Sequence, residues 1–408
     1  ARTGACDDGR VSATPTAART HAPRVRAVAR RSERVTPLEL FFDLVFVLAL
    51  TQCTTLIVHQ HTTFTSVARG MLVLAVLWWS WVGYAWLTSV VDPEEGAVRL
   101  AIFAAMAALL VCALCVPGAF GAEALLFACA YGVVRAAHIL LFRLASREDP
   151  ALRHSVATLA CSTALGVGLL LAAALAGAGS TAQWALWIAA VALDMGGPFL
   201  FGAEGWRLVP GHFAERHGAI VIIALGESIV ALGVGARAHL HAGVVAAAVL
   251  GVVVAAALWW LYFDVTALAA ERRLSRAVEG RERNELARDS YSYLHLPMVA
   301  GVALAAVGMK LTLEHVSRPL AAIPAAALFG GVALYLLAHV AFRLRNMHTL
   351  SVRRLLCAAL LLALLPLVHA LQPTSLATLA LLAAVLCALI AYEVLRYAEF
   401  RERIRHGT

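Results

Sequence analysis

Charged residues are scarce in this sequence. Asp, Glu, Lys and Arg make up 14% of the 408 residues, whereas 61% of the residues are hydrophobic. A soluble domain carries roughly a quarter charged residues, so the composition argues against a soluble fold. Apolar segments long enough to cross a bilayer as helices instead recur between residues 38 and 397. Since a transmembrane β-barrel would show shorter, alternating segments, we predict an all-α polytopic membrane protein.

The sequence also lacks the common catalytic and nucleotide-binding motifs. It contains no GxxxxGKS/T phosphate-binding loop, no GxSxG nucleophile turn, no HExxH zinc motif and no GxGxxG dinucleotide fingerprint. ATP-driven transport by this chain is therefore not expected, and whether the protein is an enzyme stays open. His212, Glu215 and His217 have the spacing H-x-x-E-x-H, which fits no catalytic zinc helix. We expect no bound metal and no cofactor.

Breaks rich in proline, glycine and charged residues divide the apolar sequence into twelve candidate spans. These spans are residues 38–59, 67–90, 97–116, 120–145, 152–176 and 181–203 in the first half, and 213–235, 241–268, 288–311, 318–342, 353–371 and 375–397 in the second. Residues 1–37 are polar and rich in arginine, which predicts a disordered cytoplasmic tail. Residues 401–408 form a short basic C-terminal tail.

Basic residues are distributed unevenly among the segments between the spans. If the N-terminus is cytoplasmic, 28 of the 33 Lys and Arg residues fall in cytoplasmic segments and 4 fall outside. Because positive residues concentrate on the cytoplasmic side of membrane proteins, we predict that both termini are cytoplasmic. The net charge of +8 comes from these clusters and does not indicate a nucleic-acid partner. The expected partners are the lipid bilayer and an unidentified small solute or ion.

Three short motifs occur in the same order in both halves of the sequence. They are ELFFDLVFVLAL from residue 39 and ERHGAIVIIAL from 215, WWSWVGY at 78–84 and WWLYFD at 259–264, and HILLFRL at 138–144 and HVAFRLR at 339–345. We therefore predict a duplication of six spans, with repeat 1 at residues 38–204 and repeat 2 at residues 205–400. Six spans return the chain to the same side, so the repeats are expected to be parallel. Transporters with parallel halves place their binding sites near mid-membrane, where the halves meet.

Charged residues inside the spans mark the candidate sites, because each costs about 2.5–3.5 kcal/mol in hydrocarbon unless it finds a partner. Glu39 and Asp43 lie one helical turn apart on one face of the first span. Glu215 and Arg216 begin the seventh span, and Glu227 lies about 16 Å deeper in the membrane. For Asp43 and Glu227, a functional role and a structural hydrogen bond or ion pair both stay open.

The fourth span carries Tyr131, Arg135 and His138 on one face of its helix. Arg135 needs an acidic partner or several carbonyl groups. The sequence does not select this partner among the acids inside the spans. A structural counter-ion role and an anion-binding role are therefore both open for Arg135.

Asp194 in the sixth span is followed at once by Gly196, Gly197 and Pro198. Proline removes a helix donor and glycine loosens the backbone. A broken helix beside a carboxylate is typical of binding sites in transporters. We therefore predict a break at this point, with a simple kink as the alternative.

Two further polar positions occur in the spans of the second half. His295 lies one turn from Tyr291 in the ninth span, where it is either a proton relay or metal ligand, or a hydrogen-bonded core residue. Asp264 ends the eighth span close to two tryptophans and Tyr262. That aromatic group indicates either core packing or the lining of a site for an organic substrate.

Four stretches of the sequence resemble the low temperature requirement protein A family of bacterial membrane proteins. They are TPLELFFDLVFVLALTQ at 36–52, WWSWVGYAWLTSVVD at 78–92, HFAERHGAIVIIALGES at 212–228 and WWLYFD at 259–264. The resemblance implies an integral protein of the bacterial inner membrane, associated by name with growth in the cold. It implies no agreed reaction or substrate. The charged positions within the matching stretches include Glu39, Asp43, Glu215, Arg216, Glu227 and Asp264.

The first hypothesis for function is a secondary transporter or ion-coupled permease. Its substrate- or ion-binding residues, expected to meet in a hydrated pocket near mid-membrane, are Asp43, Arg135, Asp194, Glu227 and His295. The supporting residues are Glu39, Tyr131, His138, Glu215, Arg216 and Asp264. No catalytic residue is assigned.

Two alternatives stay open beside transport. A membrane-embedded enzyme acting on a lipid or other apolar substrate would use acids and histidines gathered near the cytoplasmic side. The residues that favour this reading are Glu39, Asp43, Glu215, His217 and Asp264. The other alternative is a sensor or scaffold in which the charges only hold helices together.

Overall fold

The computed structural model describes residues 34–58, 62–94, 96–200, 205–236 and 240–396. Except for residues 34–37, the predicted N-terminal tail lies outside the described residues, as does the basic C-terminal tail. Within the described residues the structure is helical and contains no β-strand; an isolated bridge joins Pro319 and Thr374. The predicted all-α class is confirmed.

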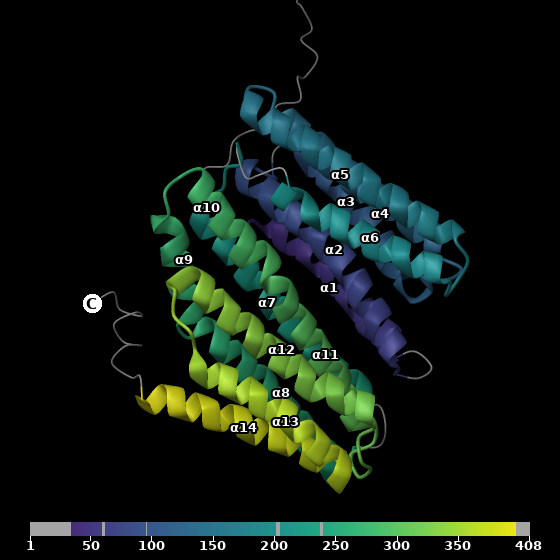
Figure 1. The fold of residues 1–408 in the computed structure, drawn as a ribbon, viewed down its shortest axis with the longest axis vertical. Helices are drawn as coiled ribbons and strands as arrows, with labels where there is room; N and C mark the ends of the chain where they lie inside the picture. Colours follow the sequence, from purple (N-terminus) through teal and green to yellow (C-terminus); the bar gives the residue numbers. More distant parts are fainter. Residues whose placement is uncertain (1–33, 59–61, 95, 201–204, 237–239, 397–408) are drawn as a thin grey trace, which may run out of the picture.

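Twelve helices of 20 residues or more occupy the described residues and match the twelve predicted spans in order (Figure 1). They are α1 (Pro37–Val58), α2 (Phe64–Val90), α3 (Gly96–Cys115), α4 (Ala124–Ala145), α5 (Pro150–Leu175), α6 (Thr181–Leu200), α7 (Pro210–Gly235), α8 (Ala242–Phe263), α11 (His295–Glu314), α12 (Ala322–Met347), α13 (Val352–Leu371) and α14 (Ser375–Arg396). Eleven of the corresponding segments are long and apolar enough to cross a membrane, and α6 is the helix outside that set.

Local sequence signals explain where several of these helices begin and end. The side chain of Asp149 accepts hydrogen bonds from the first backbone amides of α5, and Pro150 follows at the first helical position. Thr63 and Ser66 form a reciprocal capping box at the start of α2. Pro117 lies in the short 3-10 turn η1 (Val116–Gly118) that follows α3. The breaks predicted from polar and proline residues therefore correspond to caps and turns.

The ninth predicted span is divided in the structure. A short α10 (Arg281–Leu286) leads into a π-helical segment η2 (Ala287–Tyr293), and α11 begins only at His295. Another short helix, α9 (Thr266–Arg276), follows α8. A π-turn carries one more residue than an α-turn, and such segments occur often at functional sites.

The predicted break in α6 is wrong. The helix continues through Gly196, Gly197 and Pro198 to Leu200, where the described part of this segment ends. Proline lacks the amide hydrogen that would bond to the carbonyl group four residues earlier, at Asp194. Because Pro198 lies in the last described turn, one backbone bond is lost and the turns before it are kept.

The two halves share one order of neighbouring helices. In the first half α1 packs on α2 and α3, and α3 on α4, α4 on α5, α5 on α6 and α2 on α6 complete the group. In the second half α7 packs on α8 and α11, and α11 on α12, α12 on α13, α13 on α14 and α8 on α14 follow the same order. Figure 1 shows the halves as two groups of helices side by side.

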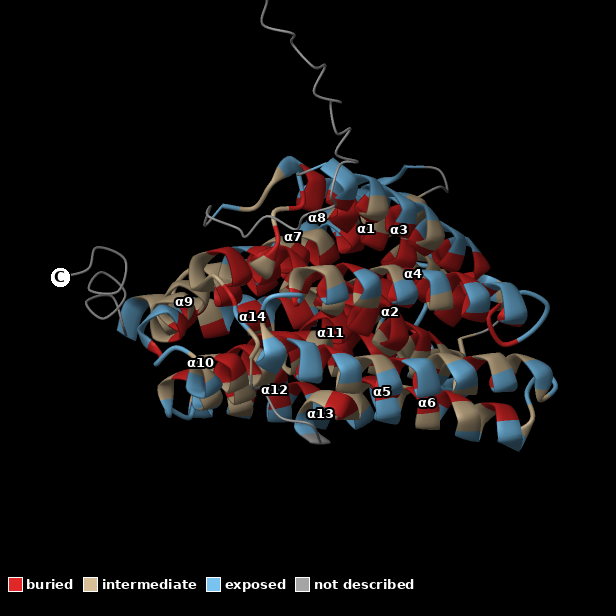
Figure 2. Ribbon diagram, turned by 90° about the horizontal axis from the view of Figure 1, so that it is seen from above, coloured by how far each residue is buried: buried red, intermediate tan, exposed pale blue. Residues whose placement is uncertain are grey.

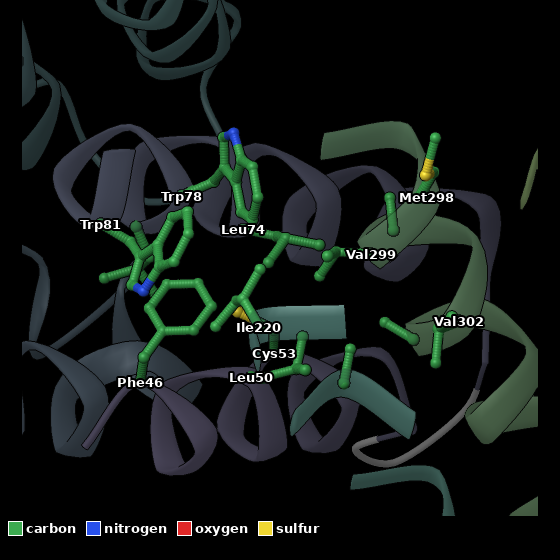
Figure 3. Packing of buried hydrophobic residues seen from close by; sticks show 14 of the residues in the cluster. Phe46, Leu50, Cys53, Leu74, Trp78, Trp81, Ile220, Met298, Val299 and Val302 are labelled. Atoms are coloured by element: carbon green, nitrogen blue, oxygen red, sulfur yellow. The ribbon is translucent and has the colours of Figure 1, made fainter. Parts of the chain in front are cut away.

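The core lies where the two halves meet. Helices α1 and α2 contact α7 and α11 across this boundary. Figure 3 shows Phe46 of α1, Trp78 and Trp81 of α2, Ile220 of α7 and Val299 of α11 packed together there. Buried residues face the interior, and exposed residues lie on the outer faces (Figure 2). Many of the exposed residues are large and apolar. An apolar exterior is the arrangement that a helical bundle in lipid requires.

Glycines bring α11 and α12 unusually close together. A Cβ atom added at Gly331 would lie 2.6 Å from the carbonyl oxygen of Gly301 and 2.7 Å from the amide nitrogen of Ala305. A Cβ atom added at the adjacent Gly330 would meet no atom within 4 Å. Small residues at such crossings allow backbones to approach in membrane proteins.

We expect Gly331→Ala to lower the free energy of unfolding by about 1–3 kcal/mol, since the added methyl group overpacks a contact between backbones. The matched control Gly330→Ala, one residue away in the same helix, is expected to leave stability unchanged or slightly raised. Denaturant unfolding in mixed detergent micelles measures both variants. Equal stabilities for the two would contradict the importance of this close approach.

Candidate functional site

Helices α1 and α7 meet along a line of polar contacts with one constant register. His212 Nε2 lies 2.8 Å from Glu39 Oε1, and Arg216 Nη1 donates to Asp43 Oδ2 over 2.7 Å. Further along, the Thr54 hydroxyl donates to Glu227 Oε1 over 3.3 Å. Each pair is separated by 173 residues. A constant separation requires two helices that run parallel, so α1 and α7 point in the same direction.

The first part of this line is an α1–α7 ionic network formed by Glu39, Asp43, Trp81, His212 and Arg216. The Trp81 indole donates to Asp43 Oδ1 over 2.8 Å, and the Arg216 guanidinium lies over the Trp81 ring at 5.4 Å. Arg216 also donates to the backbone oxygen of Glu39 over 2.9 Å. All five side chains are buried. The carboxylate of Asp43 is thus held by one cation and one indole, which supports the structural ion pair left open by the sequence.

Arg135 is paired with Asp194, the acid that the sequence could not select. Arg135 Nη2 lies 2.9 Å from Asp194 Oδ1 and 2.7 Å from the Thr163 hydroxyl. The Tyr131 hydroxyl donates to Asp194 Oδ2 over 2.7 Å, and the Thr163 hydroxyl lies 3.0 Å from Oδ1. These residues come from α4, α5 and α6, so this network belongs entirely to the first half.

A cavity of about 530 Å³, measured with its open mouth, lies beside this network and between the halves. We call it the inter-half cavity. Its lining comes from α2, α4, α5, α6 and the segment after α6 on one side and from α10 and η2 on the other. The lining residues are Trp79, Val82, Gly83, Trp86, Arg135, His138, Phe142, Leu159, Pro198, Trp206, Asn284, Arg288 and Ser292.

Arg135 and His138 reach the inter-half cavity with hydrogen-bonding groups that are not used. Among the described residues, Arg135 Nε and both ring nitrogens of His138 have no hydrogen-bond partner of good geometry, although the His138 ring lies against the backbone of Gly83. Both side chains are buried. A buried polar group without a partner costs about 1–3 kcal/mol. Arg135 lies at the middle of α4. The wall of the cavity therefore carries donors and an acceptor near the middle of α4.

Gly83 makes room for these two side chains. A Cβ atom at Gly83 would lie 2.9 Å from His138 Nε2 and 3.1 Å from Arg135 Nη1. The absence of a side chain on α2 thus lets both polar groups pass against its backbone.

A second hollow adjoins the inter-half cavity. It shares Trp206 and Asn284 with the cavity, and its other lining residues include Asp149, Arg207 and Arg283. Its volume is about 640 Å³ with open solvent included. We call it the surface vestibule. The two hollows are therefore neighbours, with Trp206 and Asn284 between them.

Glu227 lies apart from both networks, in the half of α7 that follows its midpoint. Its carboxylate accepts from the hydroxyl groups of Thr51 and Thr54 in α1. No Lys, Arg or His nitrogen within the described ranges forms an ion pair with it inside 4 Å. It is buried between hydroxyl groups rather than beside a cation.

His295 lies in a cluster of aromatic and histidine side chains. Its Nε2 is 2.8 Å from the Tyr262 hydroxyl, and its Nδ1 is 3.1 Å from the backbone oxygen of Ser290. Its ring lies 5.1 Å from that of His217 and stacks on Tyr291 at 5.3 Å. In the part of the chain that the structure describes, no three His, Cys, Asp or Glu side chains are grouped to hold a metal ion.

The structure does not bring the five predicted binding residues into one pocket. Asp43 lies in the α1–α7 ionic network, Arg135 and Asp194 lie beside the inter-half cavity, and Glu227 and His295 occupy two further places. The expected meeting of acids from both halves is therefore wrong. The physical reason is local pairing, because Asp43 and Asp194 each have an arginine within hydrogen-bond distance, whereas hydroxyl groups hold Glu227. Their proposed binding roles stay predictions.

The supporting residues are also divided among these places. Tyr131 and His138 accompany Arg135, whereas Glu39 and Arg216 belong to the α1–α7 ionic network. Glu215 is exposed and accepts a hydrogen bond from the backbone amide of Val35 over 2.9 Å. Asp264 is half-buried at the end of α8. The supporting set therefore marks two interior networks and two positions near helix ends.

Sequence reasoning missed the neutral partners in these networks, including Thr51, Thr54, Thr163 and Trp81. Hydroxyl and indole groups cost little inside a membrane helix, so they did not attract attention beside the charged residues. One feature of the sequence did relate α1 to α7, namely the predicted repeat. The predicted repeat aligns residue 39 with residue 215, which differs from the observed register by about one helical turn.

A bundle of membrane-length helices with buried ionic networks and an interior cavity defines a polytopic helical membrane protein. A family model described as bacterial low temperature requirement A protein (LtrA) matches residues 34–391. The chain belongs to this family of bacterial membrane proteins. It is 30% identical over 288 residues to an uncharacterized protein of Rhizobium meliloti (strain 1021), covering 68% of this chain and 69% of the relative. No solved structure matches the chain.

We expect Arg216→Met to lower the free energy of unfolding by about 3–5 kcal/mol, because it leaves Asp43 buried without a counter-ion. Adding Asp43→Leu to this variant is expected to recover part of the loss. The control Arg207→Met breaks a salt bridge whose arginine is 71% exposed and is expected to cost at most about 1 kcal/mol. Denaturant unfolding in detergent micelles gives all three values, and equal losses for Arg216→Met and Arg207→Met would contradict the assignment.

Proposed function

We propose that this protein is a secondary transporter that binds a small organic solute in the inter-half cavity. The observation that carries the proposal is the pair Arg135 and His138, buried in the wall of a cavity between the halves with hydrogen-bonding groups that are not used. Ligand sites are typically concave and apolar with a few well-placed polar groups. This cavity has that composition.

The lining indicates the chemistry of the solute. Trp79, Trp86, Phe142 and Trp206 supply aromatic surface, which suits a flat apolar body. Arg135 Nε–H is a donor, and a neutral His138 supplies one donor and one acceptor. A solute with one carbonyl, carboxyl or hydroxyl group on an apolar frame would satisfy these groups.

Packing in the two halves supports the predicted duplication. In the first half Tyr84 of α2 lies against His138 of α4, with ring centroids 5.5 Å apart. In the second half Tyr262 of α8 lies against His339 of α12 at 5.6 Å. Each tyrosine follows a tryptophan by three residues. Together with the shared helix order and the parallel α1 and α7, this pair supports two parallel repeats that could rock against one another.

The orientation that we propose places both termini in the cytoplasm and the protein in the bacterial inner membrane. The surface vestibule is lined by residues of segments that the charge distribution assigns to the cytoplasmic side, including Asp149 and Arg207. On this orientation the inter-half cavity opens toward the cytoplasm. The enzyme alternative has less support, because Glu39 and Asp43 are bound within the α1–α7 ionic network.

Thiol labelling in membrane vesicles tests the proposal without a known solute. In a variant whose eight cysteines are replaced, Val82→Cys places a thiol on the cavity wall, and Val332→Cys places one in the packed core of α12 as a control. We expect a charged, membrane-impermeant thiol reagent to modify Val82→Cys rapidly in inside-out vesicles and more slowly in right-side-out vesicles. Val332→Cys is expected to stay unmodified in both.

Each outcome of this labelling has a definite meaning. Reaction of Val82→Cys from both sides supports alternating access. Reaction from the cytoplasmic side alone would identify a binding pocket that does not transport, and protection from both sides would contradict a solute-accessible cavity.

A further inference from the structure

Glu227 differs from the other buried acids in its surroundings. Asp43 and Asp194 each contact an arginine at hydrogen-bond distance. Glu227 instead meets the hydroxyl groups of Thr51 and Thr54, which both belong to α1. The contact lies on the parallel line where the two halves touch. A carboxyl group at this point can change its charge without breaking an ion pair.

The threonines can serve Glu227 in either of its protonation states. The Thr51 hydroxyl lies 3.1 Å from the Val47 carbonyl oxygen, and the Thr54 hydroxyl lies 2.8 Å from the Thr51 carbonyl oxygen. Each hydroxyl has one proton and can turn it either to its own helix backbone or to the carboxyl group. Both directions are therefore within hydrogen-bond distance for both side chains.

Counting protons shows that no heavy atom has to move. When Glu227 is ionised, Thr51 and Thr54 both donate to its oxygens. When Glu227 is protonated, its own hydroxyl donates to a threonine oxygen, and that threonine turns its proton back to the helix backbone. Since both states are hydrogen-bonded, neither leaves an unpaired buried donor of the kind that is costly in a membrane.

We infer that Glu227, Thr51 and Thr54 form a proton-binding site at the contact between the two halves. The inference rests on the proposed transport function and names its coupling ion. Binding a proton removes the negative charge of Glu227 between α1 and α7. The charge at the contact between the halves therefore changes, and the proposed motion of the halves would take place at this contact. None of these three residues lines the inter-half cavity, so the proton site and the cavity are distinct.

The geometry favours a proton over a metal cation. The Thr51 hydroxyl and Glu227 Oε2 are in direct hydrogen-bond contact. A cation held between two oxygens keeps each at about 2.0–2.6 Å and would force this pair apart. The titratable groups that act on Glu227 from neighbouring helices are Cys53 of α1 and Lys310 of α11.

Infrared difference spectroscopy of the full chain in lipid nanodiscs tests the site directly. We expect acidification of the wild type to produce the carbonyl band of a buried protonated carboxyl group, and Glu227→Gln to abolish that band. Glu215→Gln, which changes an exposed carboxyl group on the same helix, is the matched control and is expected to keep it. Persistence of the band in Glu227→Gln would overturn the assignment.

The threonines provide a second readout that does not depend on removing the acid. We expect Thr51→Val to shift the frequency of the band, because the carboxyl group loses a hydrogen bond, and Thr51→Ser to restore it. An unshifted band in Thr51→Val would remove the threonine from the site. Loss of the band on adding sodium at constant pH would identify a sodium site and overturn the proton assignment.

Thiol labelling separates this inference from the transport proposal. We expect the labelling rate of Val82→Cys to depend on pH, and Glu227→Gln to make that rate independent of pH. If the infrared result holds while Val82→Cys reacts from one side alone, the proton site stands and transport fails. If Val82→Cys reacts from both sides with the same pH dependence in Glu227→Gln, transport stands and the proton site fails.

Discussion

The parallel contact between α1 and α7 is the constraint on which the rest of the structure depends. A charged side chain buried in a lipid-embedded bundle is costly without a partner, and the register between these helices brings partners to Glu39, Asp43 and Glu227. His212 finds Glu39 and Arg216 finds Asp43 because both pairs share one spacing. A slip of one residue along either helix would separate both pairs. The same register holds the two halves of the molecule together at their centre.

The sequence was sufficient for the class of fold and for the faces of single helices. Length and apolarity predicted the twelve helices, and helical periodicity placed Tyr131, Arg135 and His138 together. Periodicity says nothing about which helices become neighbours. The choice of Asp194 as the partner of Arg135 depends on how α4, α5 and α6 pack, so it was not predictable from spacing. Local backbone rules also overstated the effect of Pro198, because the proline removes one backbone hydrogen bond and the helix around it is kept.

Glycines allow different contacts in the two halves, although both halves share one order of neighbouring helices. In the second half, glycines allow α11 and α12 to touch through their backbones. In the first half, Gly83 instead makes space for the side chains of Arg135 and His138 beside a cavity. Glycine thus allows two helix backbones to touch in one half and leaves room for polar side chains in the other.

Two tryptophans of α2 bind the same residue of the π-helical segment η2, and they differ in how far they depend on the side chain of that residue. The Trp78 indole donates to the backbone oxygen of Ser292 over 2.8 Å, whereas the Trp86 indole donates to the hydroxyl oxygen of the same residue over 2.9 Å. Every amino acid supplies a backbone oxygen, but few supply a hydroxyl group. A substitution at residue 292 therefore keeps the hydrogen bond of Trp78. The hydrogen bond of Trp86 is kept only if the new side chain also carries an acceptor.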